Sequence, residues 1–201
     1  MGPPASWESH RFSAIIILPF LGVSAALWKW NRWPARVFVG DTYCYFAGMV
    51  FAVVGILGHF SKTMLLLFLP QILNFIYSCP QLFHIVPCPR HRLPKFNEKD
   101  GLLYPSTADL RETPAKSFFQ PILKLLHFFR LIHLEYENDK MVSCTNMTLI
   151  NLVLVWMGPM REDKLCNTIL QLQFIIGILA IIARHTLGAL LFGHDNLWSI
   201  V

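Results

Sequence analysis

The feature that most constrains this chain is a pair of apolar runs joined by a short polar turn. The first run covers residues 43–58, the turn covers residues 59–62, and the second run covers residues 63–79. Each run is slightly shorter than the roughly 20 residues that cross a bilayer core as a helix. If both runs cross, the segments Arg36-Val-Phe-Val-Gly-Asp41 and Pro87-Cys-Pro-Arg-His-Arg92 emerge on the same membrane face.

The composition favours a membrane protein over a soluble one. Hydrophobic residues make up 54% of the 201 residues, charged residues only 14%, and the mean hydropathy is +0.46. A soluble domain must cover its surface with polar groups, which this balance does not provide. The net charge of +5 comes largely from loops beside apolar runs, so topology and phosphate contact explain it without nucleic acid. The five cysteines are expected to be reduced, because they form no dense framework.

Two further apolar runs, residues 12–28 and 165–183, raise the number of expected crossings to four. The earlier run ends in Trp28-Lys-Trp-Asn-Arg-Trp33, an aromatic and basic border that favours a retained helix anchored at the membrane interface. A cleaved signal peptide is the alternative, because Val23-Ser-Ala25 fits a cleavage site. The polar residues 1–11 are expected to be disordered.

The return run carries residues that a lipid-facing helix does not favour. Pro70 predicts a kink or break there. Gln71 and Asn74 are expected to face protein or ligand, because an unpaired amide is costly in lipid. The outgoing run has small residues that suit close helix contact, namely Gly48, Gly55 and Gly58.

A long polar segment, residues 84–145, follows the return run. Residues 93–114 indicate a loop with little regular structure, and residues 135–140 a polar turn. Residues 118–134 predict a helix with a narrow polar stripe of Lys124, His127, Arg130 and His133. We favour an interfacial helix there, with a helix packed against the spans as the alternative. Residues 147–160 are apolar but short for a span, so they predict a second interfacial helix.

We therefore predict an all-α polytopic membrane protein with about four transmembrane helices and a long cytosolic loop bearing one or two interfacial helices. The expected divisions are a disordered segment 1–11, three spans in 12–83, the loop in 84–145, and an interfacial helix with the last span in 146–201. Most lysines and arginines fall on the face that carries Asp41 and Arg90, which the positive-inside rule makes cytosolic, with both termini across the membrane. The glycosylation sequon Asn146-Met-Thr148 then lies on the cytosolic side.

Five side chains near that face have two interpretations each. Asp41 either caps the helix that follows it or ligates Mg²⁺, which takes one or two carboxylates together with water and phosphate. Arg90 and Arg92 either mark topology or clamp phosphate oxygens with their planar donor forks. His91 is either a solvated loop residue or a donor to a sugar or phosphate, and Phe38 either anchors the interface or stacks on a base.

Four motifs carry a resemblance to a known family. They are Arg36-Val-Phe-Val-Gly-Asp-Thr-Tyr-Cys-Tyr-Phe-Ala-Gly48, Val53-Val-Gly-Ile-Leu-Gly-His-Phe-Ser-Lys-Thr63, Pro87-Cys-Pro-Arg-His-Arg92 and Asn146-Met-Thr-Leu-Ile-Asn151. The chain resembles the eukaryotic members of the polyprenyl-phosphate sugar-1-phosphate transferase family from about Phe12 to near its C-terminus. The resemblance covers only the C-terminal half of those ten-span enzymes.

The resemblance implies a transferase of the endoplasmic reticulum membrane that moves GlcNAc-1-phosphate from UDP-GlcNAc to dolichyl phosphate with Mg²⁺. This reaction begins the lipid-linked oligosaccharide of protein N-glycosylation. It implies that Asp41 binds Mg²⁺ and that Phe38 packs on the uracil. It also implies that Arg90 contacts the diphosphate, while His91 and Arg92 recognise GlcNAc.

Part of the family's catalytic machinery lies outside the resemblance. The Asp-Asp motif, an Asn-rich metal and nucleotide loop and the lysine for the acceptor phosphate belong to the other half, and no Asp-Asp pair occurs in this sequence. We therefore expect no catalysis by a truncated form alone. The alternative function is a non-catalytic short form that associates with the full-length enzyme or forms a homodimer, and a lipid or anion carrier is a third hypothesis.

Overall fold

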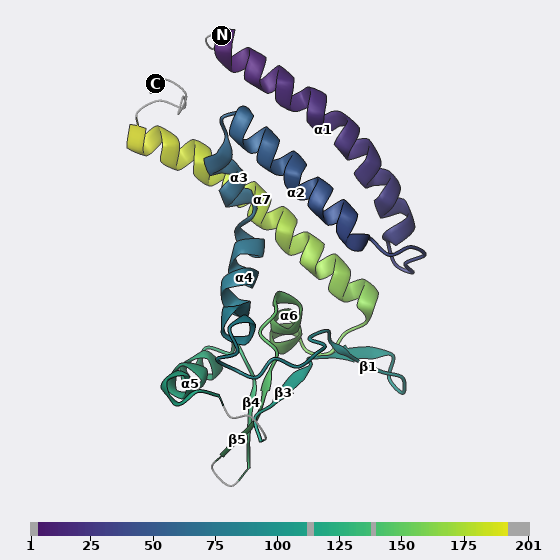
Figure 1. Ribbon diagram of the computed structural model, residues 1–201, viewed down its shortest axis with the longest axis vertical. Helices are drawn as coiled ribbons and strands as arrows, with labels where there is room; N and C mark the ends of the chain where they lie inside the picture. Colours follow the sequence, from purple (N-terminus) through teal and green to yellow (C-terminus); the bar gives the residue numbers. More distant parts are fainter. Residues whose placement is uncertain (1–3, 112–114, 138–139, 193–201) are drawn as a thin grey trace. The chain divides into compact units, whose positions relative to one another are not determined.

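The computed structural model describes residues 4–111, 115–137 and 140–192, and the side chains of residues 7–111, 115–137 and 140–186 (Figure 1). It divides into two compact units, Met1–Leu69 with Phe174–Val201, and Pro70–Gln173. The divisions expected from the sequence stay a prediction.

Long apolar helices supply the candidate membrane spans. Helices α1 (Pro4–Asn31), α2 (Gly40–Leu57) and α7 (Glu162–Phe192) each contain a stretch long and apolar enough to cross a membrane, and the pair α3 (Ser61–Leu67) and α4 (Leu69–Leu82) supplies a fourth if it forms one broken span. The expected count of about four spans therefore agrees with the three or four candidates found among the described residues. The break at Phe68 lies just before Pro70, which confirms the predicted kink.

The first helix starts earlier than expected. Helix α1 begins at Pro4 and continues without a break through Phe12, so the described part of residues 1–11 is helical instead of disordered. Residues 1–3 lie outside the described residues, as do residues 193–201. The polar residues of this segment add turns to the N-terminal end of the apolar helix. The helix start was placed too late because it was inferred from the beginning of the apolar run, and these turns precede that run.

In the first unit, α1 and α2 lie side by side (Figure 1) around a small apolar cluster. Phe20 on α1 packs with Val50 and Val54 on α2, and these three side chains are at most 9% exposed. Gly58, directly after α2, packs closely against α1, because a Cβ atom at this position would lie 2.6 Å from the Ser13 hydroxyl oxygen. The predicted close contact is therefore present at Gly58, whereas a Cβ atom at Gly48 would meet nothing within 4 Å among the described residues.

The described residues of the second unit form two small antiparallel sheets, so the chain is mostly helical but not all-α as predicted. Strands β1 (Lys95–Asn97) and β2 (Leu102–Tyr104) form one hairpin, and β3 (Thr107–Asp109), β5 (Lys140–Thr145) and β4 (Leu134–Glu137) form a three-stranded sheet in that order (Figure 1). The expected loop 93–114 and the expected polar turn 135–140 are wrong at these strands. Strands of three to six residues are too short to show a clear period-two pattern in the sequence.

The predicted helix 118–134 is also shorter than expected. A 3₁₀ turn, η1 (Ser117–Phe119), leads into α5 (Gln120–Phe128), and the helix ends because Arg130 adopts a φ of 56°. The chain then turns directly into β4. Leu123 on α5 is fully buried, whereas Phe128 is 79% exposed, so one face of this helix packs on the unit and the other does not. Helix α6 (Leu149–Met157) likewise buries Leu152, Val153 and Leu154.

The main core of the second unit lies between the three-stranded sheet, α5 and the residues that follow α4. Its fully buried members include Val86, Leu123, Cys144 and Met147. Burial raises the pKa of the Cys144 thiol to about 12, because the thiolate would lose its hydration. Cys144 is therefore a neutral core residue at neutral pH.

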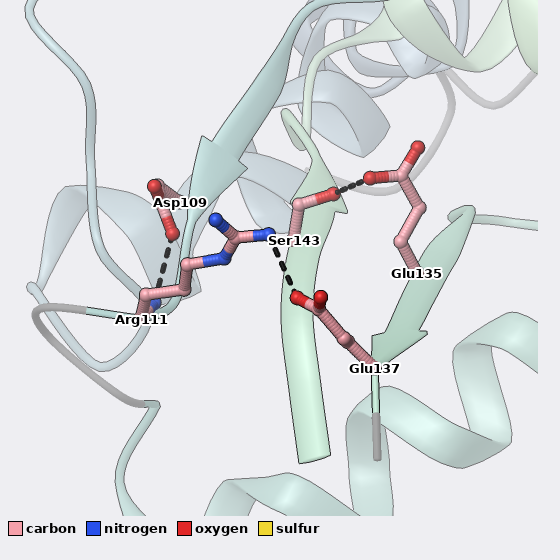
Figure 2. A network of polar contacts seen from close by, with 5 residues as sticks. All are labelled: Asp109, Arg111, Glu135, Glu137 and Ser143. Atoms are coloured by element: carbon pink, nitrogen blue, oxygen red, sulfur yellow. Dashed lines mark hydrogen bonds and ion pairs between the residues drawn. The ribbon is translucent and has the colours of Figure 1, made fainter. Parts of the chain in front are cut away.

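Polar side chains of the three-stranded sheet, and Arg111 beside it, pair with one another. Figure 2 shows Arg111 donating from Nη2 to Glu137 over 2.9 Å, and the Ser143 hydroxyl donating to Glu135 over 2.6 Å. Both partners of the Arg111–Glu137 pair are more than 60% exposed, so the pair contributes about 0–1 kcal/mol. The positive charge of Arg111 is thus paired with the carboxylate of Glu137.

Candidate functional site

The segment that carries Phe38 is tied to the end of α1. The Asn31 side chain donates to the carbonyl of Val37 over 2.9 Å, and the main-chain nitrogen of Arg36 donates to the carbonyl of Trp30 over 2.9 Å. The Phe38 side chain itself is 88% exposed. This arrangement holds the backbone while leaving the aromatic ring open to a planar partner, as base stacking requires.

Asp41 lies in the first turn of α2, directly after Gly40, which has a φ of 72°. The N-cap residue is Val39, and no side chain caps this helix. Within the described residues the exposed Asp41 carboxylate has no hydrogen bond or ion pair, so the capping interpretation is not supported. Two residues later the Tyr43 hydroxyl donates to the Ser24 hydroxyl over 2.7 Å, which fixes this turn of α2 against α1.

The basic segment, residues 87–92, belongs to the second unit and follows the fully buried Val86. Arg90 and His91 are exposed, whereas Arg92 is partly buried. The Nη1 atom of Arg92 is buried and has no hydrogen-bond partner among the described residues. A buried cationic donor without an acceptor is costly, so this atom suits an acceptor oxygen from a bound molecule.

Sequence reasoning missed the side chains that hold this basic segment. Gln81 Nε2 donates to the carbonyl of Pro87 over 3.3 Å, at the start of the segment. At its end, the carbonyl of Arg92 accepts from Asn151 Nδ2 over 3.0 Å and from the Ser106 hydroxyl over 3.1 Å. Asn151 within an apolar run was the available signal, because a buried amide needs a partner.

The predicted site is divided between the two compact units. Phe38 and Asp41 lie in the first unit, and Arg90, His91 and Arg92 lie in the second. Their meeting on one membrane face therefore stays a prediction. Within the described residues no group of three or more His, Cys, Asp or Glu side chains gathers as a metal site. Asp41 alone could supply one carboxylate to a cation whose other ligands are water and phosphate.

Comparison with known proteins matches both segments. Residues 5–59, which include Phe38 and Asp41, match the family model of glycosyl transferase family 4. The whole chain is 77% identical over 201 residues to a protein of Saccharomyces cerevisiae named UDP-N-acetylglucosamine--dolichyl-phosphate N-acetylglucosaminephosphotransferase. Proteins of the same name from Schizosaccharomyces pombe and Dictyostelium discoideum are 51% identical over 194 residues and 46% identical over 169 residues.

These alignments cover most of this chain but less than half of each relative. They include 100%, 94% and 84% of the chain, and 45%, 44% and 32% of the respective relatives. The resemblance seen in the sequence is thus confirmed, together with its restriction to part of the enzymes. Its expected start near Phe12 was too late, because the Saccharomyces cerevisiae protein matches over the full length of this chain.

Proposed function

We propose that this chain supplies the uracil, metal and diphosphate-sugar contacts of an enzyme that transfers GlcNAc-1-phosphate from UDP-GlcNAc to dolichyl phosphate. One observation carries the proposal. In a chain 77% identical to an enzyme named for these two substrates, the Asp41 carboxylate and the Arg92 Nη1 have no protein partner within the described residues. The Asp41 carboxylate is available to a metal ion, and the Arg92 Nη1 is available to an acceptor oxygen of the GlcNAc moiety.

Each candidate residue has a distinct role in this proposal. Phe38 stacks on the uracil, and Asp41 is a ligand of Mg²⁺, which neutralises charge on the diphosphate when it is bound. Arg90 contacts the diphosphate, while His91 and Arg92 donate to the GlcNAc moiety. The guanidinium groups also favour the charge that develops as UMP departs.

The reaction that these contacts support is a displacement at phosphorus. An oxygen of dolichyl phosphate forms a bond to the β-phosphorus of UDP-GlcNAc, and the bond from that phosphorus to the bridging oxygen breaks. UMP leaves with the bridging oxygen and the electron pair of the broken bond. Positioning and charge neutralisation supply most of the rate enhancement in this class of reaction.

The proposed location is the endoplasmic reticulum membrane, with the Asp41 and Arg90–Arg92 segments on the cytosolic side. It follows from the basic residues beside the spans and from the printed substrates of the relatives. A membrane-impermeant thiol reagent tests this orientation in sealed microsomes. Cys88 should react from the cytosolic side, and a Lys62→Cys variant should react only after permeabilisation; the reverse pattern would refute the orientation.

The activity test compares this chain alone with the chain expressed together with the part of the Saccharomyces cerevisiae relative that it does not match. UMP release is measured with UDP-GlcNAc, dolichyl phosphate and Mg²⁺. We expect release only from the completed protein, and its loss on Asp41→Ala. Arg111→Ala is the matched control, because Arg111 is paired with Glu137 on an exposed sheet. A well-folded completed protein that releases no UMP would refute the proposed function.

A second candidate function is that of a non-catalytic chain that associates with the full-length enzyme. The observation that favours it is that the alignment covers only 45% of the Saccharomyces cerevisiae relative. Co-purification of the two chains from membranes tests it. Stable association of this chain with the full-length enzyme, without UMP release by the completed protein, would favour this candidate. Self-association of this chain alone would instead support a homodimer.

A further inference from the structure

We propose that four buried polar side chains, Gln81, Ser106, Asn146 and Asn151, are positioning residues that set the shape of the basic segment 87–92 and so aim Arg92 at its ligand. The inference rests on the proposed function for the identity of that ligand, UDP-GlcNAc. These side chains lie in one compact unit with the segment they hold. In this proposal the four side chains act through the backbone of the segment, whose Pro87 and Arg92 carbonyls they bind.

Gln81 holds the start of the basic segment and is fully buried. Its Nε2 atom donates to the Pro87 carbonyl over 3.3 Å and to Asn146 Oδ1 over 2.9 Å. Its Oε1 atom accepts from the main-chain nitrogen of Met147 over 2.8 Å. Both polar atoms of this carboxamide are thereby satisfied, and a satisfied buried amide has one orientation.

Asn151 and Ser106 hold the other end. Asn151 Nδ2 donates to the Arg92 carbonyl over 3.0 Å, and the Ser106 hydroxyl donates to the same carbonyl over 3.1 Å. Asn151 Oδ1 accepts from the main-chain nitrogen of Ser106 over 2.9 Å. Asn151 is 0% exposed and Ser106 is 3% exposed, so water does not compete for these bonds.

Asn146 connects the two ends. It accepts from Gln81 through Oδ1, as described, and it donates from Nδ2 to the Ser106 hydroxyl oxygen over 2.8 Å. A continuous chain of side-chain hydrogen bonds therefore runs from the Pro87 carbonyl to the Arg92 carbonyl. A displacement at one end of the basic segment is resisted by bonds at the other.

The basic segment depends on this network because it has little support of its own. Within the described residues, 87–92 form no helix or strand, and no main-chain to main-chain hydrogen bond involves them. Pro87 and Pro89 have no N–H group to donate. The carbonyls at the two ends are thus fixed by side chains that come from elsewhere in the sequence.

A stabilising role alone would not require amides at these places. Apolar side chains of similar volume commonly stabilise a core as well as a polar network does. The amides instead fix one backbone geometry of the basic segment. The Arg92 guanidinium, whose buried Nη1 has no partner among the described residues, needs such a fixed backbone if it is to meet a ligand oxygen. A positioning role and a purely stabilising role therefore predict different results on mutation.

Peptide-resolved thiol alkylation of the full chain in detergent tests this fixation without requiring activity. Cys88 lies in the basic segment, and the fully buried Cys144 reports unfolding of the unit. We expect Asn151→Leu and Gln81→Met to accelerate alkylation of Cys88 several-fold while Cys144 stays protected. Leu123→Ala, which removes a fully buried side chain from the core, should expose both thiols together. Unchanged Cys88 labelling, or equal acceleration of both thiols by the amide variants, would overturn the proposal.

A kinetic measurement on the completed protein tests the consequence for the ligand. Ser106→Ala, which removes only the hydroxyl bonds, and Asn151→Leu should raise KM for UDP-GlcNAc, by about tenfold if ~1.4 kcal/mol of binding is lost, with a smaller change in kcat. Unchanged KM in variants with accelerated Cys88 labelling would refute positioning. Absence of UMP release from the unmodified completed protein would refute the proposed function instead, and the alkylation result would still decide whether the segment is held.

Discussion

The side-chain oxygen of Asn74 on α4 accepts a hydrogen bond from the main-chain nitrogen of Leu149, the first residue of α6, over 2.7 Å. The first N–H groups of a helix have no partner within the helix, so this bond satisfies one of them. The side-chain nitrogen of Gln71, also on α4, donates to the side-chain oxygen of Gln173 over 2.8 Å. Both amides of the return run therefore meet protein, as the sequence led us to expect.

Replacing Asn74 should weaken the second unit in a way that depends on the acceptor oxygen. Asn74→Ala leaves the Leu149 N–H without a partner and should cost about 1–3 kcal/mol of folding free energy. Asn74→Asp keeps an acceptor at a helix N-terminus, where a negative charge is favourable, and should retain most of the stability. Thermal unfolding in detergent measures both variants. Equal losses for Ala and Asp would contradict this explanation.

Gly58 and Gly48 should respond differently to the same substitution. A Cβ atom at Gly58 would lie 2.5 Å from the Val54 carbonyl oxygen and 2.6 Å from the Ser13 hydroxyl oxygen, whereas one at Gly48 would meet nothing within 4 Å. Gly58→Ala should therefore lower stability by about 1–3 kcal/mol through overpacking, while Gly48→Ala should be neutral or slightly stabilising. The midpoint of thermal inactivation ranks them, and a neutral Gly58→Ala would refute the close contact with α1.

Cys144 should make the second unit less stable in alkali. Its folded-state pKa is raised to about 12 by burial, above the ordinary value of about 8.5. A group whose folded pKa is raised contributes stability that is present below its unfolded pKa and is lost as pH rises toward the folded pKa. Stability should therefore fall from about pH 8.5 upward, by at most about 1.4 kcal/mol per pH unit from this thiol.

The matched experiment follows unfolding of the unmodified protein and of Cys144→Ala between pH 7 and pH 10. The variant starts from lower stability, because it loses a buried sulfur, but its pH dependence should be weaker. Parallel curves for the two proteins would mean that the thiol does not carry the effect.

Arg92 and Arg111 should differ under a charge-conserving change. Arg92→Lys keeps the positive charge but removes the planar fork whose Nη1 is buried, so kcat/KM of the completed protein should fall about 10- to 100-fold. Arg111→Lys alters only an exposed pair and should change activity by less than about twofold. The UMP-release assay compares them. Full activity of Arg92→Lys would remove this side chain from the proposed GlcNAc contact.

The parts of the fold that the sequence predicted are those with a local cause. Continuous apolar runs predicted the candidate spans, and Pro70 predicted the break at Phe68 because proline disrupts helical hydrogen bonding locally. The strands were missed because they contain only three to six residues. One of them, β3, also depends on a distant partner, since Thr107 pairs with Thr145. The end of α5 depends on the backbone of Arg130, which no hydropathy pattern encodes.

The candidate site divides in the same way. Phe38, Asp41 and Arg90–Arg92 came from loop position and from resemblance, and the structure adds which of them lack protein partners. The amide network could not be foreseen, because Gln81 and Asn146 bond across 65 positions of sequence. Single buried polar residues in apolar runs were the only local trace of it.

The burial of Asn146 has a consequence for protein quality control in the cell. Asn146 starts the sequon Asn146-Met-Thr148, yet its side chain is 0% exposed and its amide nitrogen already donates to Ser106. Oligosaccharide transfer needs that same nitrogen to be reachable, so the native state is a poor acceptor whichever compartment the segment enters. A sugar chain found at this asparagine would act as a tag of mis-inserted and unfolded molecules.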